Sequence, residues 1–106
     1  MKLRGGERTI GVADLSGAKK FFVEALGMRV LEQSGSALVL DAGARLRVQQ
    51  GPAGGRVELE TAGLAQLVES LDEKGYYADG PKETPEGAYA DVDGVQGVEI
   101  VIWEAK

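Results

Sequence analysis

The residue types in this chain exclude several kinds of catalytic and metal-binding site before any fold is considered. The sequence has no histidine and no cysteine, so it cannot form a serine–histidine triad, a thiolate nucleophile, a disulfide or a structural zinc site. Carboxylates remain for acid–base chemistry, and Glu58, Glu60 and Glu99 lie in strand-like segments. A general acid needs a raised pKa, whereas alternating glutamates are common on the solvated side of a strand.

Two further motifs lack the features of a catalytic or phosphate-binding site. The glycine-rich stretch at residues 51–55 has neither the lysine nor the following helix of a phosphate-binding loop, and we interpret it as a linker. The pair Tyr76 and Tyr77 follows a predicted helix, and we interpret it as packing at the end of that helix.

The net charge and the length limit the partners that we expect. The chain has 17 acidic and 12 basic residues and a formal charge of -5, and it has no basic cluster of the kind that binds phosphates. We therefore expect neither nucleic acid nor a membrane as partner. The sequence contains no bilayer-spanning apolar stretch and no signal-peptide pattern, so we expect a cytoplasmic protein. A chain of 106 residues is expected to form a single domain with a modest core.

Apolar residues at helical spacing predict two helices. The first begins at Asp14 or Ser16, which can cap it, and ends at Gly27. The second covers residues 63–74 and ends at Gly75. Strand-like alternation predicts strands at residues 8–12, 29–32, 37–40, 45–49, 56–60, 76–78, 88–90 and 98–103.

Several landmarks recur at a nearly constant offset of about 50 residues, which indicates a duplicated unit. Residues 13–15 match residues 62–64, Gly27 matches Gly75, and residues 41–43 match residues 91–94. The pattern predicts an α+β fold of two tandem βαβββ modules. Module one covers about residues 6–50, the linker residues 51–55, and module two about residues 56–104. A ferredoxin-like α+β sandwich with coincidental spacing is the alternative.

Period-two alternation sorts the strand residues onto two faces. The aliphatic face is expected to pack under the helices; it comprises Ile10, Val12, Leu46, Val48, Val57, Leu59, Val98, Ile100 and Ile102. The opposite face mixes arginines and glutamates with Trp103, and Tyr89 is expected nearby. Flat aromatic surfaces beside oriented polar groups are typical of a ligand pocket. A solvated sheet face, with Trp103 at an edge or a subunit contact, gives the same pattern.

Five segments, in their order and spacing, are similar to the glyoxalase/bleomycin-resistance family, also called the vicinal oxygen chelate superfamily. They are residues 12–15, 21–28, 71–75, 91–94 and 98–100, and the second places an aromatic pair ahead of Leu-Gly. Two departures are Val92, where the family has proline, and a turn before Val98 that is one residue longer. The resemblance covers nearly the whole chain and implies curled mixed sheets that form a cup, often completed in a homodimer.

The resemblance implies either divalent-metal chemistry or drug binding without a metal. In metal-using members four strands supply one ligand each, and these positions fall near Glu7, Arg47, Arg56 and Glu99. A guanidinium stays protonated, has no lone pair to offer and repels a cation. We therefore predict no metal and no other cofactor, and we expect these four residues to form a salt-bridge network.

The sequence thus predicts a metal-free protein that binds an aromatic or cationic small molecule such as an antibiotic. No catalytic residue is predicted, and the ligand-binding residues are predicted to be Arg47, Gln49, Arg56, Glu58, Glu60, Tyr89, Glu99 and Trp103. One alternative is a lyase, isomerase or dioxygenase of the same superfamily that uses a divalent metal or carboxylate acid–base chemistry. Another is a module that fills its cup with its own side chains and mainly dimerises.

Overall fold

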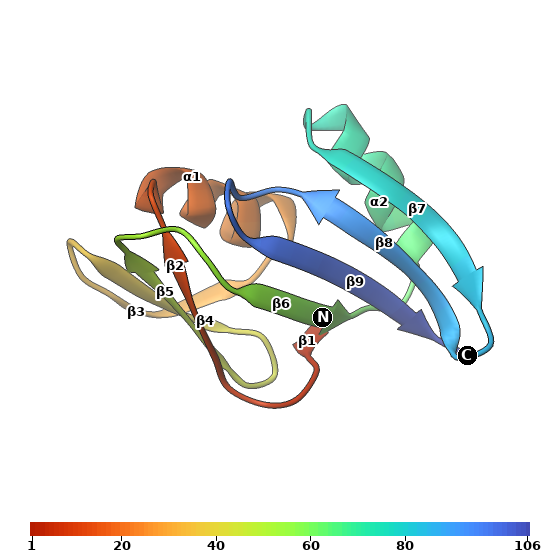
Figure 1. Cartoon of the computed structure of the whole chain (residues 1–106), viewed down its shortest axis with the longest axis horizontal. Coiled ribbons are helices and arrows are strands. Elements are labelled where there is room, and N and C mark those ends of the chain that lie inside the picture. The colour runs from red at the N-terminus through yellow and green to blue at the C-terminus, as the bar shows by residue number, and fades with distance from the viewer.

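The strands form two separate mixed sheets in the computed structural model, which describes all 106 residues (Figure 1). The first sheet has the order β2-β5-β4-β3, with bounds Arg8–Val12, Arg45–Gln50, Ala37–Asp41 and Arg29–Gln33. Its β2 and β5 are parallel and the other pairs are antiparallel. The helix α1, Leu15–Lys19, continues as a π-helical segment η1, Lys20–Ala25.

The second sheet repeats this arrangement and adds one strand from the start of the chain. Its order is β1-β6-β9-β8-β7, with bounds Lys2–Leu3, Arg56–Glu60, Glu99–Ala105, Gly87–Asp93 and Tyr77–Thr84. The helix α2, Leu64–Glu73, packs on one face of it. Each sheet therefore contains one βαβββ unit and neither closes into a barrel. The predicted fold is confirmed, and a single ferredoxin-like sheet is not what the chain forms.

The first helix differs from its prediction in two respects. Asp14 occupies the N-cap position in extended conformation, but its side chain accepts no capping hydrogen bond, so the expected cap is wrong. From Lys20 onward the helix widens into π-helical turns. A wider turn reduces the angle between successive side chains, which lets Phe21 and Phe22 both become fully buried. Gly27 ends the helix at a φ of 76°, as predicted.

One hydrophobic core runs through both modules. All nine residues of the predicted aliphatic face are buried in it. The ring of Phe21, from module one, packs edge to face against Tyr76 of module two at 5.0 Å and against Phe22 at 5.2 Å. Tyr76 thus has a packing role, as predicted, whereas the side chain of Tyr77 is 67% exposed.

The first strand crosses from one module to the other. Lys2 and Leu3 pair with Glu60 and Leu59 of β6, while the backbone N–H of Leu3 donates to Ala42 in the first module at 2.7 Å. The division into modules at residues 51–55 stays a prediction, since the shared core and this crossing strand join the two units.

Two strands of the second sheet are longer than predicted. β7 continues to Thr84 and β8 runs from Gly87 to Asp93, so the predictions of residues 76–78 and 88–90 were wrong in length. The alternation is broken at Gly80 and Pro81, where the pairing of β7 with β8 shifts register, and this break concealed the second half of β7. No helix of the structure has the length and apolar character needed to cross a bilayer.

Candidate functional site

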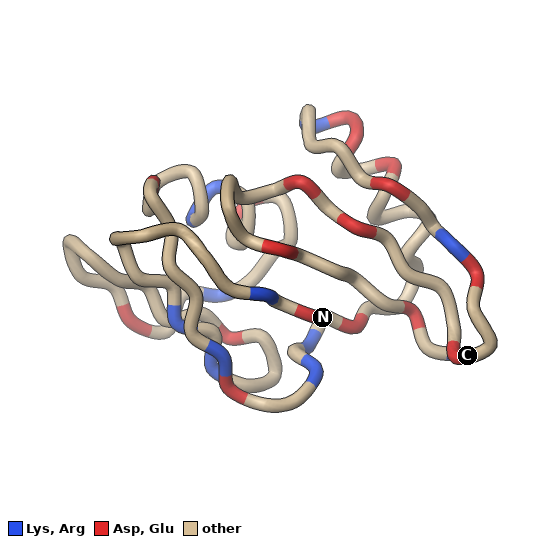
Figure 2. Tube along the Cα trace, viewed as in Figure 1, with Lys and Arg blue, Asp and Glu red and all other residues tan.

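The face of the second sheet opposite α2 brings together most of the predicted site residues; we call it the second-sheet face. The register places Arg56 opposite Glu99, and Glu60 opposite Trp103. Trp103 in turn lies opposite Tyr89 on β8. Figure 2 shows acidic residues spread along β7, β8 and β9. Six of the eight predicted ligand-binding residues lie on this face: Arg56, Glu58, Glu60, Tyr89, Glu99 and Trp103.

An aromatic row crosses this face, and we use that name for Arg4, Trp103, Tyr89 and Lys82. The Trp103 and Tyr89 ring centroids are 5.0 Å apart. On the β6 side the Arg4 guanidinium lies 4.4 Å from the Trp103 centroid, and on the β7 side Lys82 Nζ lies 5.6 Å from that of Tyr89. Each ring is therefore already in cation–π contact with a side chain of the protein.

The carboxylates of Glu58 and Glu60 contact the aromatic row on its β6 side. The indole Nε1 of Trp103 donates to Glu58 Oε1 at 3.2 Å. Arg4 Nε donates to Glu60 Oε1 at 2.9 Å, and Lys2 Nζ lies 3.8 Å from the other oxygen of Glu60. These contacts fix the orientation of the indole and keep Glu60 paired.

Arg56 and Glu99 form the closest ion pair on the second-sheet face. Arg56 Nη1 donates to Glu99 Oε2 at 2.7 Å, and Nη2 lies 3.5 Å from Glu58 Oε1. The pKa of Arg56 is raised, first by the hydrogen bond to Glu99. A guanidinium this close leaves Glu99 poorly suited to bind a metal ion.

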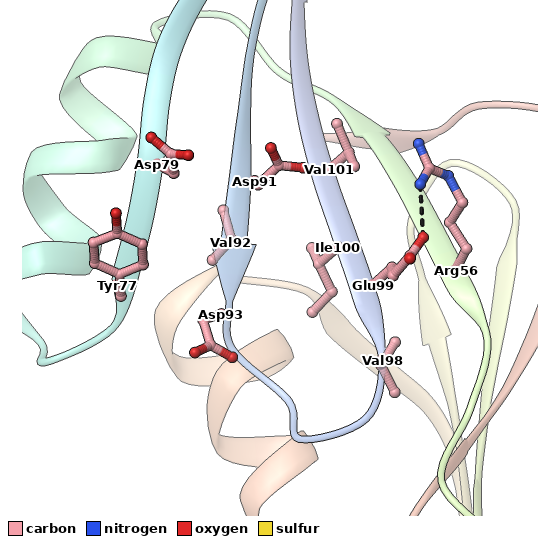
Figure 3. Close-up of a pocket in the computed structure, with 10 residues that line it drawn as sticks. All are labelled: Arg56, Tyr77, Asp79, Asp91, Val92, Asp93, Val98, Glu99, Ile100 and Val101. Atoms are coloured by element: carbon pink, nitrogen blue, oxygen red, sulfur yellow. Dashed lines mark hydrogen bonds and ion pairs between the residues drawn. The ribbon is translucent and has the colours of Figure 1, made fainter.

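An open hollow of about 390 Å³ lies beside the aromatic row, and we call it the acidic hollow (Figure 3). Four carboxylates surround it: Asp79, Asp91, Asp93 and Glu99. Val101, in the middle of this polar face, is 4% exposed, and the exposed ring of Tyr77 stands at the edge. The hollow thus combines acidic walls with one exposed aromatic ring, above aliphatic side chains that are almost fully buried.

Lys82 is the nearest cation to two of these carboxylates. Its Nζ lies 2.8 Å from Asp79 and 3.7 Å from Asp91, and its pKa is raised, first by the hydrogen bond to Asp79. Asp93 has no such partner. With Lys82 and Arg56 as its cations, the hollow keeps an excess of negative charge.

Four residues of the acidic hollow were not predicted from the sequence to be site residues: Tyr77, Asp79, Asp91 and Asp93. The sequence did indicate a shared face for Asp91 and Asp93, because they alternate in step with Tyr89 along one strand. They were interpreted as landmarks of the repeat and not as members of a face.

The remaining predicted residues lie on the first sheet. Gln49 and Arg47 belong to β5, and Arg47 lines a separate depression with Glu32 and Val39. Glu7 precedes β2, so the four positions expected to form one salt-bridge network fall on two sheets. Only Arg56 and Glu99 pair. No three acidic side chains are arranged to hold a metal ion, so the residues present do not fit the four-ligand metal site that the sequence resemblance implies for metal-using members.

Comparison with solved structures finds close similarity over the whole chain. TnmS3, an antibiotic binding protein from Streptomyces sp. CB03234, has a TM-score of 0.81 and 28% identity, covering 100% of this chain and 99% of that one. A glyoxalase/bleomycin resistance protein from the same organism has a TM-score of 0.77 and 28% identity, covering 94% and 99%.

A more distant structure shares the fold alone. Lactoylglutathione lyase from Agrobacterium tumefaciens has a TM-score of 0.79 at 12% identity, covering 95% of this chain and 92% of its own. No family model matches the sequence, and no curated protein matches it. The predicted resemblance is nevertheless confirmed by the structures.

Proposed function

We propose that this chain, which has the fold of the glyoxalase/bleomycin resistance protein/dioxygenase superfamily, binds a small organic cation that bears an aromatic ring. The observation that carries the proposal is the acidic hollow. Its volume of about 390 Å³ lies within the usual range for small-molecule pockets. Its carboxylates lie around Val101, which is almost fully buried, and next to the exposed ring of Tyr77.

Charge selects the class of ligand. Asp79 and Asp91 share one cation, Lys82, and Asp93 has none, so a positive group that enters the hollow gains more attraction than it displaces. An anionic ligand would meet uncompensated carboxylates. Of the predicted residues, Glu58 and Glu99 share one cation, Arg56, which orients Glu99, whereas Glu60 is paired with Arg4 and Lys2.

The relatives favour a small organic ligand. TnmS3 is an antibiotic binding protein at 28% identity over the whole chain, and sequestration of an antibiotic is the role that we propose here. A homodimer and a cytoplasmic location remain predictions. Sedimentation of the purified chain at several concentrations tests the first; Arg47 and Gln49 could join the site from a second copy only if the chain dimerises.

The experiment compares two flat probes of similar shape, N-methylquinolinium, a permanent cation, and quinoline, which is uncharged at neutral pH. Calorimetric titration is expected to show binding of the cation, about tenfold weaker for quinoline. Asp91→Asn is expected to weaken binding of the cation, whereas Glu83→Gln, which removes a charge outside the hollow, is the matched control. Equal binding of both probes, or equal effects of the two variants, contradicts the proposal. Stoichiometric nickel, zinc, manganese or iron in the purified protein would instead favour the alternative of an enzyme.

A further inference from the structure

Arg4 occupies the place on the second-sheet face that suits an organic cation best. Its guanidinium lies over the indole of Trp103 at 4.4 Å and donates to Glu60 at 2.9 Å. An aromatic face with a carboxylate beside it is the combination that proteins use to recognise ammonium and guanidinium groups. The chain therefore supplies its own cation to this pair of residues.

We propose that Arg4 is an intramolecular competitor of the ligand, and that a cation reaches the face of Trp103 only when the Arg4 side chain leaves it. The inference rests on the proposed function, because it concerns the aromatic end of the same second-sheet face. Arg4 then determines specificity: a ligand gains the indole surface only if it also replaces the positive charge beside Glu60.

The backbone around Arg4 is anchored independently of its side chain. The N–H of Arg4 donates to the carbonyl of Glu58 at 2.9 Å, and the N–H of Leu3 donates to Ala42 at 2.7 Å. Leu3 is buried in the common core. Releasing the guanidinium therefore requires a change of side-chain rotamer and leaves β1 in place.

The contacts of the guanidinium are of a kind that a ligand can replace. The side chains of Arg4 and Glu60 are 29% and 27% exposed, so solvent reaches both and screens their attraction. A neutral aromatic ligand that displaced Arg4 would remove the closer of the two cations beside Glu60, leaving only Lys2 at 3.8 Å. A flat cation restores both the stacking and the ion pair, so Arg4 favours flat cations over neutral aromatic molecules.

Trp103 is the only tryptophan of the chain, so its fluorescence reports on this ring alone. Arg4→Gln is expected to make Trp103 more accessible to quenching by acrylamide and to tighten binding of N-methylquinolinium about tenfold. Lys2→Gln is the matched control, because Lys2 also lies near Glu60, at 3.8 Å, but does not cover the ring. It should change neither quantity more than about twofold.

Three outcomes separate the inference from the proposed function. If Arg4→Gln and Lys2→Gln tighten binding equally, net charge explains the effect and the inference is wrong. If calorimetry shows cation binding that depends on Asp91 while Arg4→Gln changes neither affinity nor acrylamide quenching, the inference fails and the proposed function stands. If neither the natural chain nor Arg4→Gln binds the cation, the proposed function itself fails. Arg4→Lys keeps a cation over the ring and should bind N-methylquinolinium like the natural chain. This control excludes misfolding as the cause of a changed affinity in Arg4→Gln.

Discussion

Gly94 lies in the loop between β8 and β9, where the second module meets the first helix. A Cβ atom at this position would overlap three ring carbons of Phe21, the farthest of them, Cδ1, at 2.5 Å. The Phe21 ring is fully buried and is held by Phe22 and Tyr76. We expect Gly94→Ala to destabilise the protein by forcing this ring out of its position between the modules.

The magnitude follows from the overlap. Non-bonded carbon atoms prefer separations of about 3.5 to 4.0 Å, so the ring must move by about 1 Å. Overpacking of this kind costs about 1 to 3 kcal/mol. Gly94 has no left-handed φ, so alanine adds no backbone strain and recovers about 0.4 to 1 kcal/mol from the unfolded state. Taken from the midpoints of these two ranges, the net loss is about 1.3 kcal/mol, or a fall in melting temperature of roughly 5 to 10 °C.

The assay is thermal and urea unfolding followed by circular dichroism. Gly35→Ala is the control, because no atom lies within 4 Å of its added Cβ and its φ is not left-handed. Phe21→Leu combined with Gly94→Ala should cost less than the sum of the single variants, since the shorter side chain removes the overlapping ring edge. The reasoning is refuted if Gly94→Ala unfolds within about 0.5 kcal/mol of Gly35→Ala, or if the double variant is simply additive.

Three further predictions concern charged side chains. The carboxylate of Glu104 accepts hydrogen bonds from the backbone N–H groups of Gly63, the N-cap of α2, and Leu64, its first residue, at 2.7 and 3.4 Å. Glu104→Ala should therefore lower the free energy of unfolding by about 1 kcal/mol in urea titrations. The pKa of Lys82 is raised, first by its hydrogen bond with Asp79. The stabilisation that Lys82 contributes is therefore complete below a pH of about 10.4 and is lost as the pH rises through the pKa of the folded state. The difference in melting temperature between the natural chain and Lys82→Met should shrink at alkaline pH. Removing the guanidinium with Arg56→Gln frees Glu99 and should tighten binding of N-methylquinolinium severalfold in calorimetry at low salt, an effect that vanishes at high salt.

Alternation along single strands was enough to predict the two faces of β2, β5, β6 and β9. Because side chains alternate strictly in a strand, the aliphatic Val57 and Ile100 could be separated from Glu58 and Trp103 by parity alone. Tyr89 was expected near this face, and the pairing of β8 with β9 in the structure sets it opposite Trp103. The fold was predicted because the same order of strand patterns recurs around each of two predicted helices.

Contacts that depend on tertiary structure were not predictable in the same way. β1 has two residues, too few to show any periodicity, so the position of Arg4 over Trp103 had no signal in the sequence. Lys82 and Asp79 were missed because Gly80 and Pro81 interrupt the alternation between them. The separation of Arg47 from Arg56 depends on how the two sheets are placed, which parity along a strand does not determine.

The crossing strand β1 determines how the chain behaves when it is divided. A cut after Gly54 gives fragments of residues 1–54 and 55–106; the first keeps all four strands of the first sheet, whereas the second lacks β1 of the second sheet. The first fragment carries β1 without its partner β6, and the second exposes the edge of β6 to which β1 is bonded. Each fragment also exposes its half of the common core. The halves of this repeat are therefore expected to fold only together, by fragment complementation, although each has the sequence pattern of a complete unit.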